Sequence, residues 1–163
     1  MSLPGQARCQ VQPGATTVCF VTSSDHAPSQ PDRPVQVLVY SSNRVVRQQI
    51  LTALGVRPDP DGPTVAYTEV ATQPALLANV DGKKFDLVIL DGEASPAGGL
   101  GMSRQLKDEI YQCPPILVVV GRAQDAWLAT WSRADAVVSH PINAIALASQ
   151  VNALLATRRA LSA

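Results

Sequence analysis

Three titratable side chains come directly after predicted strands of this sequence. Asp91 and Glu93 follow one apolar run, and His140 follows another. A carboxylate can accept a transferred group or bind a cation, and a histidine can carry a proton near neutral pH. An enzyme acting on a small molecule would need a deep pocket with several perturbed titratable groups, and we find no others near these strand ends. The pattern therefore does not favour small-molecule catalysis.

Two serines, Ser41 and Ser42, also follow a predicted strand. A nucleophilic serine needs a base with an orienting partner, and neither is apparent in the sequence. The segment is also not the strained, glycine-flanked turn that exposes a catalytic serine. The glycines at 98–101 lack the lysine and the spacing of a phosphate loop, so they are better explained as a flexible entry to a helix. Hydrolase activity is not expected.

The elements that position these residues begin at residue 35, where apolar runs start to alternate with amphipathic segments. Asn43 is the expected N-cap of the first helix and Gly55 its end. Predicted strands cover 35–40, 64–70, 85–90, 116–120 and 136–139, and predicted helices cover 44–54, 72–80, 100–111, 123–132 and 142–159. Strict alternation implies a parallel sheet covered on both faces. We predict a doubly wound α/β domain of five strands and five helices, with its functional edge at the carboxyl ends of the strands.

The composition of the chain limits the classes of partner and the cellular compartment that we expect for the protein. The chain has 163 residues, with 13 basic and 13 acidic side chains that give a formal net charge of zero. That balance argues against nucleic-acid binding, which depends on basic charge. No apolar run approaches the roughly 20 residues that span a bilayer, and no secretory signal is recognisable. The cysteines Cys9, Cys19 and Cys113 form no paired or metal-binding framework, so we expect a cytoplasmic protein without a cofactor.

The chain divides into an arm, a domain and a short tail. Residues 1–34 hold five of the 13 prolines and form a predicted flexible N-terminal arm. Within it, residues 16–22 have strong β-propensity and could add to a sheet edge. Residues 35–159 form the predicted domain and 160–163 a C-terminal tail. No output domain follows the last helix, so any output is expected to pass through binding.

The order and spacing of several motifs over residues 35–156 resemble the receiver domain of bacterial response regulators, the CheY-like family with a flavodoxin-like (βα)5 fold. The resemblance rests on Leu87-Val88-Ile89-Leu90-Asp91, Pro96 with Gly98-Gly99-Leu100, Pro115 with the strand at 116–120, and Val137-Val138-Ser139-His140-Pro141. Receivers accept a phosphoryl group on an aspartate at the end of the third strand. The resemblance therefore implies that Asp91 is the phosphoacceptor.

Several positions depart from the family pattern. Ser41 and Ser42 stand where receivers carry the acidic pair that holds Mg²⁺, and two neutral hydroxyls cannot replace two negative charges. Val120 replaces the hydroxyl at the end of the fourth strand, and His140 replaces the lysine that pairs with the phosphate. Val137 stands at the aromatic switch position, and Pro96 falls one residue later than usual. Asn43 and Glu93 could compensate in part, leaving a weak metal site with Asp91.

The two tryptophans of the sequence, Trp127 and Trp131, lie four residues apart on one face of the predicted fourth helix. We expect one of them to pack in the core. An exposed tryptophan is a common interface anchor, and in receivers this helix, with the fifth strand and fifth helix, forms the usual dimer or target surface. Both residues are therefore candidates for binding a protein partner, including a second copy of the chain.

Two functional hypotheses follow. The leading one is a stand-alone atypical receiver-like protein, not an enzyme, that signals through protein–protein binding without an Mg²⁺-dependent phosphorylation cycle. The alternative is a conventional single-domain response regulator that a histidine kinase phosphorylates on Asp91, with Glu93 or Asn43 recruiting Mg²⁺.

Overall fold

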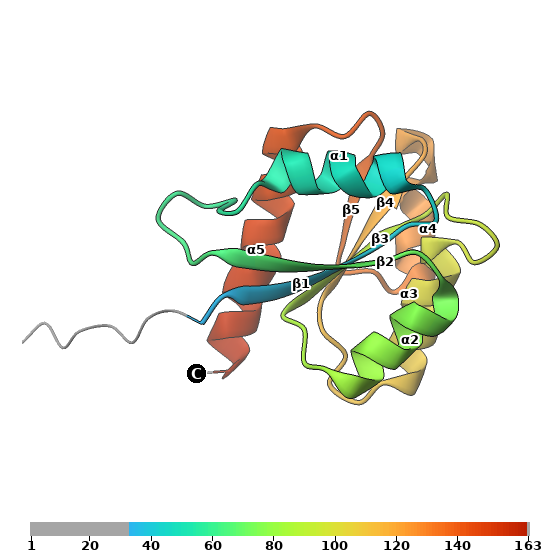
Figure 1. Ribbon diagram of the computed structural model, residues 1–163. Coiled ribbons are helices and arrows are strands. Elements are labelled where there is room, and N and C mark those ends of the chain that lie inside the picture. The colour runs from blue at the N-terminus through green and yellow to red at the C-terminus, as the bar shows by residue number, and fades with distance from the viewer. Residues whose placement is uncertain (1–32, 163) are drawn as a thin grey trace, which may run out of the picture. The chain divides into compact units, whose positions relative to one another are not determined.

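A single parallel sheet of five strands organises the protein. The computed structural model describes residues 33–162, which lie in one compact unit (Figure 1). The strand order is β2-β1-β3-β4-β5. The strands are β1 (Val35–Tyr40), β2 (Val65–Val70), β3 (Leu87–Asp91), β4 (Ile116–Val120) and β5 (Ala136–Ser139). Every neighbouring pair is parallel, which confirms the predicted doubly wound α/β fold.

Helices follow the strands in the predicted order. They are α1 (Arg44–Leu54), α2 (Gln73–Gly82), α3 (Gly99–Glu109), α4 (Leu128–Ser132) and α5 (Ala144–Ser162), with a 3₁₀ turn, η1 (Ala123–Trp127), before α4. The predicted ends of α1 are confirmed: the Asn43 side chain accepts a hydrogen bond from the Val45 N–H at 2.9 Å, and Gly55 ends the helix with φ at 61°. That positive φ favours glycine, which has no Cβ to clash.

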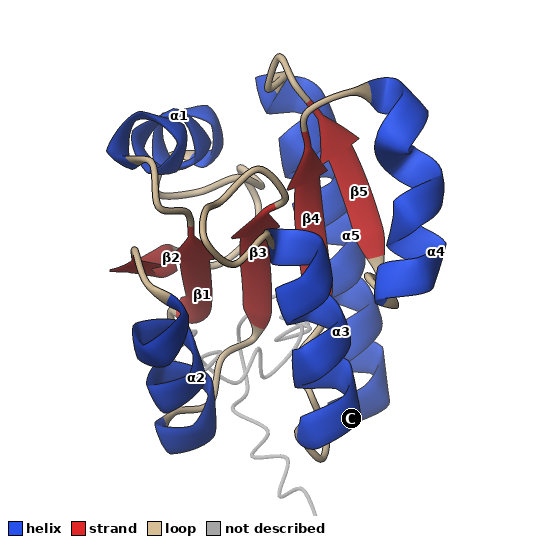
Figure 2. Cartoon of the chain, turned by 90° about the vertical axis from the view of Figure 1, so that its right-hand side faces the viewer, coloured by secondary structure: helices blue, strands red, loops and turns tan. Residues whose placement is uncertain are grey.

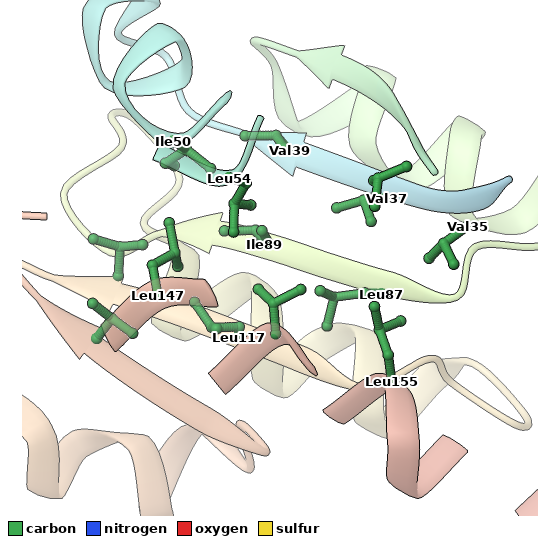
Figure 3. Packing of buried hydrophobic residues seen from close by; sticks show 14 residues of the cluster. Val35, Val37, Val39, Ile50, Leu54, Leu87, Ile89, Leu117, Leu147 and Leu155 are labelled. Carbon is green, nitrogen blue, oxygen red and sulfur yellow. The ribbon is translucent and has the colours of Figure 1, made fainter. Parts of the chain in front are cut away.

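Helices cover both faces of the sheet (Figure 2). On one face, α1 and α5 enclose a core in which Ile50 and Leu147 pack against alternate residues of the strands, among them Val37 and Ile89 (Figure 3). On the other face, α2 and α3 pack against the remaining strand residues through side chains such as Leu76 and Leu106. The central strands are thus buried on both sides and hold their carboxyl ends in fixed positions.

The segment at 123–132 differs from the prediction of one regular helix. Residues of η1 are in 3₁₀ conformation, and only the last five residues form α4. None of the η1 residues is buried, whereas α4 buries Ala129 and Ser132. Short helices depend on packing for their stability, and regular α-helix is confined to the part of this segment that has buried residues.

The predicted chain ends fall partly outside the described residues. The arm at 1–34, including the β-prone run at 16–22, lies outside them except for its last two residues. At the other end, α5 extends through Ser162 and so takes in most of the predicted tail. Among the described residues, no helix is long and apolar enough to cross a membrane.

Candidate functional site

Asp91 lies at the carboxyl end of β3 and is only 2% exposed. Its Oδ2 accepts a hydrogen bond from the Ser41 hydroxyl at 2.6 Å, and its Oδ1 accepts one from the Glu93 backbone N–H at 3.0 Å. Each carboxylate oxygen therefore has a donor from the protein itself. Such bonds stabilise a buried carboxylate without a metal ion.

The serine pair joins two loops at this edge. Ser41 is fully buried, and its Oγ also accepts the Asn43 backbone N–H at 3.0 Å. Ser42 is exposed, and its Oγ accepts the backbone N–H of Ser95 at 3.1 Å. The two residues thus connect the loop after β1 to the loop after β3. Sequence reasoning identified their positions but missed these contacts.

Tyr40, the last residue of β1, supports the same loop from below the site. It is 1% exposed, and its hydroxyl donates to the Ala97 carbonyl oxygen at 2.6 Å. Burial, and to a lesser degree the negative charge of Asp91, raises the pKa of Tyr40 above its usual value near 10. The phenol therefore stays protonated and can donate this bond at physiological pH. Sequence analysis did not single out Tyr40. Its hydroxyl group, at the end of the otherwise aliphatic buried residues of β1, was the signal that could have identified it.

Arg47, on α1, is a second residue that sequence reasoning missed. Its side chain is 14% exposed. One guanidinium nitrogen donates to the Ser41 carbonyl oxygen at 2.6 Å, and Nε pairs with Glu69 on β2 at 3.1 Å. These contacts fix the end of β1, so that Ser41 is held both through its backbone and through its side chain.

Mg²⁺ prefers several carboxylate oxygens as ligands, and the candidate ligands at this site are Asp91, Glu93 and Asn43. Asn43 uses its side-chain oxygen to cap α1. The Glu93 carboxylate lies over the end of β4, where a Cβ on Gly121 would come within 2.7 Å of its Oε1. No group of three His, Cys, Asp or Glu suited to a metal ion occurs among residues 33–162. With Ser41 donating to Asp91, these residues do not fit a resident Mg²⁺.

Val120 and His140 complete the predicted edge, but without polar contact to Asp91. Val120 is buried and presents an aliphatic side chain at the end of β4. His140 donates its backbone N–H to the Val120 carbonyl oxygen at 2.9 Å, and its side chain lines a groove along α1 with Gln49 and Ile142. Within the described part of the chain, no hydrogen bond or ion pair links His140 to Asp91. The structure thus brings Ser41, Asp91 and Glu93 together and leaves His140 at the rim.

Both tryptophans are exposed, Trp127 by 69% and Trp131 by 54%, so the expectation that one packs in the core is wrong. Trp127 lies in η1, which has no buried residue, and Trp131 lies on α4, which buries Ala129 and Ser132 instead. The Arg104 guanidinium lies 5.5 Å from the centre of the Trp131 ring, a cation–π contact, and donates to the Trp131 carbonyl oxygen. Trp131 is therefore oriented by α3 while its ring stays open to solvent.

The parallel order β2-β1-β3-β4-β5, with an aspartate buried at the end of the central strand, defines the class: a receiver-type α/β domain. No family model matches the sequence. Two proteins of Mycobacterium tuberculosis, from different strains and each named an uncharacterized response regulatory protein, are 51% identical over 121 residues, covering 74% of this chain and 91% of each relative. The chain therefore belongs to the response regulator family, and its domain is a receiver of two-component signalling.

Solved structures agree with this fold. A CheY-like response regulator receiver domain protein from Methanospirillum hungatei superposes with a TM-score of 0.63 at 16% identity, covering 78% of this chain and 98% of that one. The response regulator DrrB of Thermotoga maritima gives a TM-score of 0.62 at 15% identity over 77% of this chain. This chain spans about half of DrrB, 54% of its length. The predicted receiver fold is confirmed.

Proposed function

We propose that this protein is an atypical receiver that signals by binding other proteins, with Asp91 serving as a hydrogen-bonded structural carboxylate rather than as a phosphoacceptor in an Mg²⁺-dependent cycle. The observation that carries the proposal is the 2.6 Å hydrogen bond from Ser41 to Asp91 Oδ2. A hydroxyl occupies the place of a carboxylate and satisfies the oxygen that a metal ion would otherwise bind.

Electrostatics supports the same conclusion. Phosphoryl transfer is catalysed largely by positioning and by positive charge near the transferring oxygens. Here the fourth strand ends in the aliphatic Val120, which offers no hydroxyl, and the Glu93 carboxylate beside Gly121 adds negative charge. Arg47 is a cation at this edge, but its guanidinium is already paired with Glu69 and the Ser41 carbonyl.

The test is to incubate the full chain with Mg²⁺ and acetyl phosphate, measure the intact mass, and titrate beryllofluoride while following tryptophan fluorescence. We expect no stoichiometric mass increase and no saturable fluorescence change. Asp91→Asn is the matched control, since it keeps the shape of the side chain and removes its charge. A saturable response that disappears in Asp91→Asn would overturn the proposal.

A conventional phosphorylated response regulator is the second candidate, and the position of Glu93 favours it. The Glu93 carboxylate lies beside the end of β4, next to Gly121, and could supply one oxygen to a cation together with Asp91. A histidine kinase would then be the partner. This candidate requires Mg²⁺ binding that Glu93→Gln weakens, which isothermal titration calorimetry would show directly.

For the partner surface, we propose self-association through α4, β5 and α5. Trp127, at the end of η1, and Trp131, on α4, expose large aromatic area, and Ile145 of α5 is 82% exposed. Aromatic anchors often carry a large share of binding energy. In analytical ultracentrifugation, we expect a dimer that Trp127→Ala weakens about tenfold or more. Tyr111→Ala, which removes an exposed aromatic that follows α3, is the control, and a monomer at all concentrations would contradict the proposal.

A further inference from the structure

The segment at 123–132, which carries both tryptophans, buries little of itself against the domain. No residue of η1 is buried, and α4 buries only two small side chains, Ala129 and Ser132. Burial stabilises a segment roughly in proportion to the apolar area removed from water, so these two side chains contribute little. A helix of five residues is also too short to be stable by itself. Contacts made at the surface therefore matter for where this segment lies.

One carboxylate on α3, that of Asp108, joins two arginines at this surface. Its Oδ1 pairs with Arg133, the residue that ends α4, and its Oδ2 lies 3.4 Å from Nε of Arg104. Arg104 in turn donates to the Trp131 carbonyl oxygen at 3.0 Å, and its guanidinium lies 5.5 Å from the centre of the Trp131 ring. These four residues form one connected network between α3 and the end of α4, which we call the α3–α4 clasp.

The backbone at Arg133 is a second sign that the clasp matters. Arg133 ends α4 with φ at 58°, in the left-handed region that favours glycine. A side chain at such a position is less favourable than none, and a glycine would fit the same backbone. The ion pair with Asp108 offsets this disadvantage, and only a residue with a long cationic side chain can make it.

We propose that Asp108 is a positioning residue, which acts through Arg104 and Arg133 to hold the segment at 123–132 against α3 and so orients Trp127 and Trp131 for partner binding. The binding role of the tryptophans rests on the proposed function, whereas the clasp itself does not.

The energies involved are small but are suited to this task. A single exposed ion pair contributes little to stability, but here two ion pairs and a cation–π contact form one network. A segment with little buried area opens locally at a low cost in free energy, far below that of unfolding the domain. The clasp can therefore decide where Trp131 lies while adding little to the stability of the whole domain.

The experiment uses the full chain with Trp127→Phe, so that Trp131 is the remaining tryptophan and its fluorescence anisotropy reports the motion of its own ring. In Asp108→Asn, which keeps the shape of the side chain and removes its charge, we expect the anisotropy to fall. Amide hydrogen exchange over residues 123–133 should rise about fivefold. Asp108→Glu keeps the charge and should restore most of both values. Asp81→Asn, an equal change of charge at an exposed position of α2, is the matched control and should alter neither.

Ionic strength provides a second readout. Salt screens exposed ion pairs, because the Debye length falls from about 10 Å at about 0.1 M to about 3 Å at about 1 M ionic strength. In the chain with Trp127→Phe alone, the anisotropy should therefore fall as sodium chloride is raised over that range. The Asp108→Asn variant should respond little, since its clasp is already lost.

Unchanged anisotropy and exchange in Asp108→Asn would overturn the proposal, as would an equal change in Asp81→Asn. A rise in exchange that extends equally over β3 and β4 would show general destabilisation and would also overturn it.

The link to partner binding is tested with both tryptophans in place. We expect Asp108→Asn to weaken the dimer about threefold in analytical ultracentrifugation. A dimer of unchanged affinity together with a lowered anisotropy would overturn the positioning role. A native chain that stays monomeric would contradict the self-association in the proposed function, while the anisotropy and exchange measurements would still decide whether the clasp holds the segment. The two failures are therefore distinguishable.

Discussion

The hydroxyl of Ser41 and the carboxylate of Asp91 share a short hydrogen bond among fully buried groups. A buried carboxylate is costly unless donors surround it, because it loses its hydration on folding. Ser41 and the Glu93 N–H supply those donors on the two oxygens. At the scale of single residues, both carboxylate oxygens of Asp91 therefore have a hydrogen-bond donor within the protein.

Ser41→Ala removes one of those donors while leaving the carboxylate buried. We expect the free energy of unfolding to fall by about 2 kcal/mol, which is typical when a buried charged acceptor loses its partner. Urea denaturation of the purified variant would measure the change.

Ser42→Ala is the matched control for this prediction. Its hydroxyl is exposed and accepts only the Ser95 N–H, which water can replace. The expected loss is below about 1 kcal/mol. Equal stability losses in the two variants would contradict the special role that we assign to Ser41.

At the scale of elements, the loop between β3 and α3 is held by hydrogen bonds from β1 and the residues after it. The Tyr40 hydroxyl binds the Ala97 carbonyl, and the Ser42 hydroxyl binds the Ser95 N–H. This loop follows Asp91 directly, so these bonds fix the wall of the site. Hydrogen bonds of this kind oppose local opening of the loop.

Tyr40→Phe tests how far that loop depends on the phenol. We expect amide hydrogen exchange over residues 92–98 to rise, and the free energy of unfolding to fall by about 1 kcal/mol, the usual worth of one hydrogen bond. Exchange over β4 should stay unchanged as an internal reference. Unaltered exchange in the loop would show that the other contacts suffice to hold it.

The connection between α1 and β2 predicts a pH dependence. The Tyr67 hydroxyl donates to the Gly55 carbonyl at 2.7 Å, and burial raises the pKa of Tyr67 from 10.0 to about 12. The folded state thus holds this proton more tightly than the unfolded state. Its stabilising effect is complete below pH 10 and is lost as the pH rises toward 12. We expect the urea midpoint to fall over that interval in the native protein, and to fall less in Tyr67→Phe.

Local sequence patterns were sufficient to predict most elements. The bounds of β1, α1, β4 and β5 agree with the predicted ranges, because each is a short apolar run or a capped amphipathic helix. The region at 123–132 was not predictable in the same way. Its conformation depends on which of its residues become buried against the rest of the domain, and burial is a tertiary property that the periodicity of the sequence does not record.

The candidate site was predictable in position but not in its contacts. Asp91, Ser41 and Glu93 come together because the ends of parallel strands meet at one edge. The parts played by Tyr40 and Arg47 depend on which way each side chain points and on partners far along the chain. Sequence spacing alone does not contain that information.

At the scale of the whole molecule, the two ends of the sheet differ in charge. The carboxyl end presents Asp91, Glu93 and the paired cation Arg47, whereas the amino end presents Asp86 with two arginines near it, Arg33 and Arg158. Asp86 and Asp91 lie at opposite ends of β3, about 16 Å apart at the rise of an extended strand.

A carboxylate pair can be introduced directly after β1, at Ser41 and Ser42, in the intact protein. The double variant Ser41→Asp with Ser42→Asp places a second buried carboxylate against Asp91, so without Mg²⁺ we expect lower stability than in the native chain. Mg²⁺ would then relieve the repulsion, and at 100 times its dissociation constant it would restore about 2.7 kcal/mol. The melting temperature of the double variant should therefore rise with Mg²⁺, while that of the native protein stays constant. Adding Asp91→Asn to the double variant should remove most of this rise in melting temperature, because the side chain at position 91 then has no negative charge to bind Mg²⁺. A native protein that gains as much from Mg²⁺ as the double variant would show that Ser41 and Ser42 do not prevent metal binding.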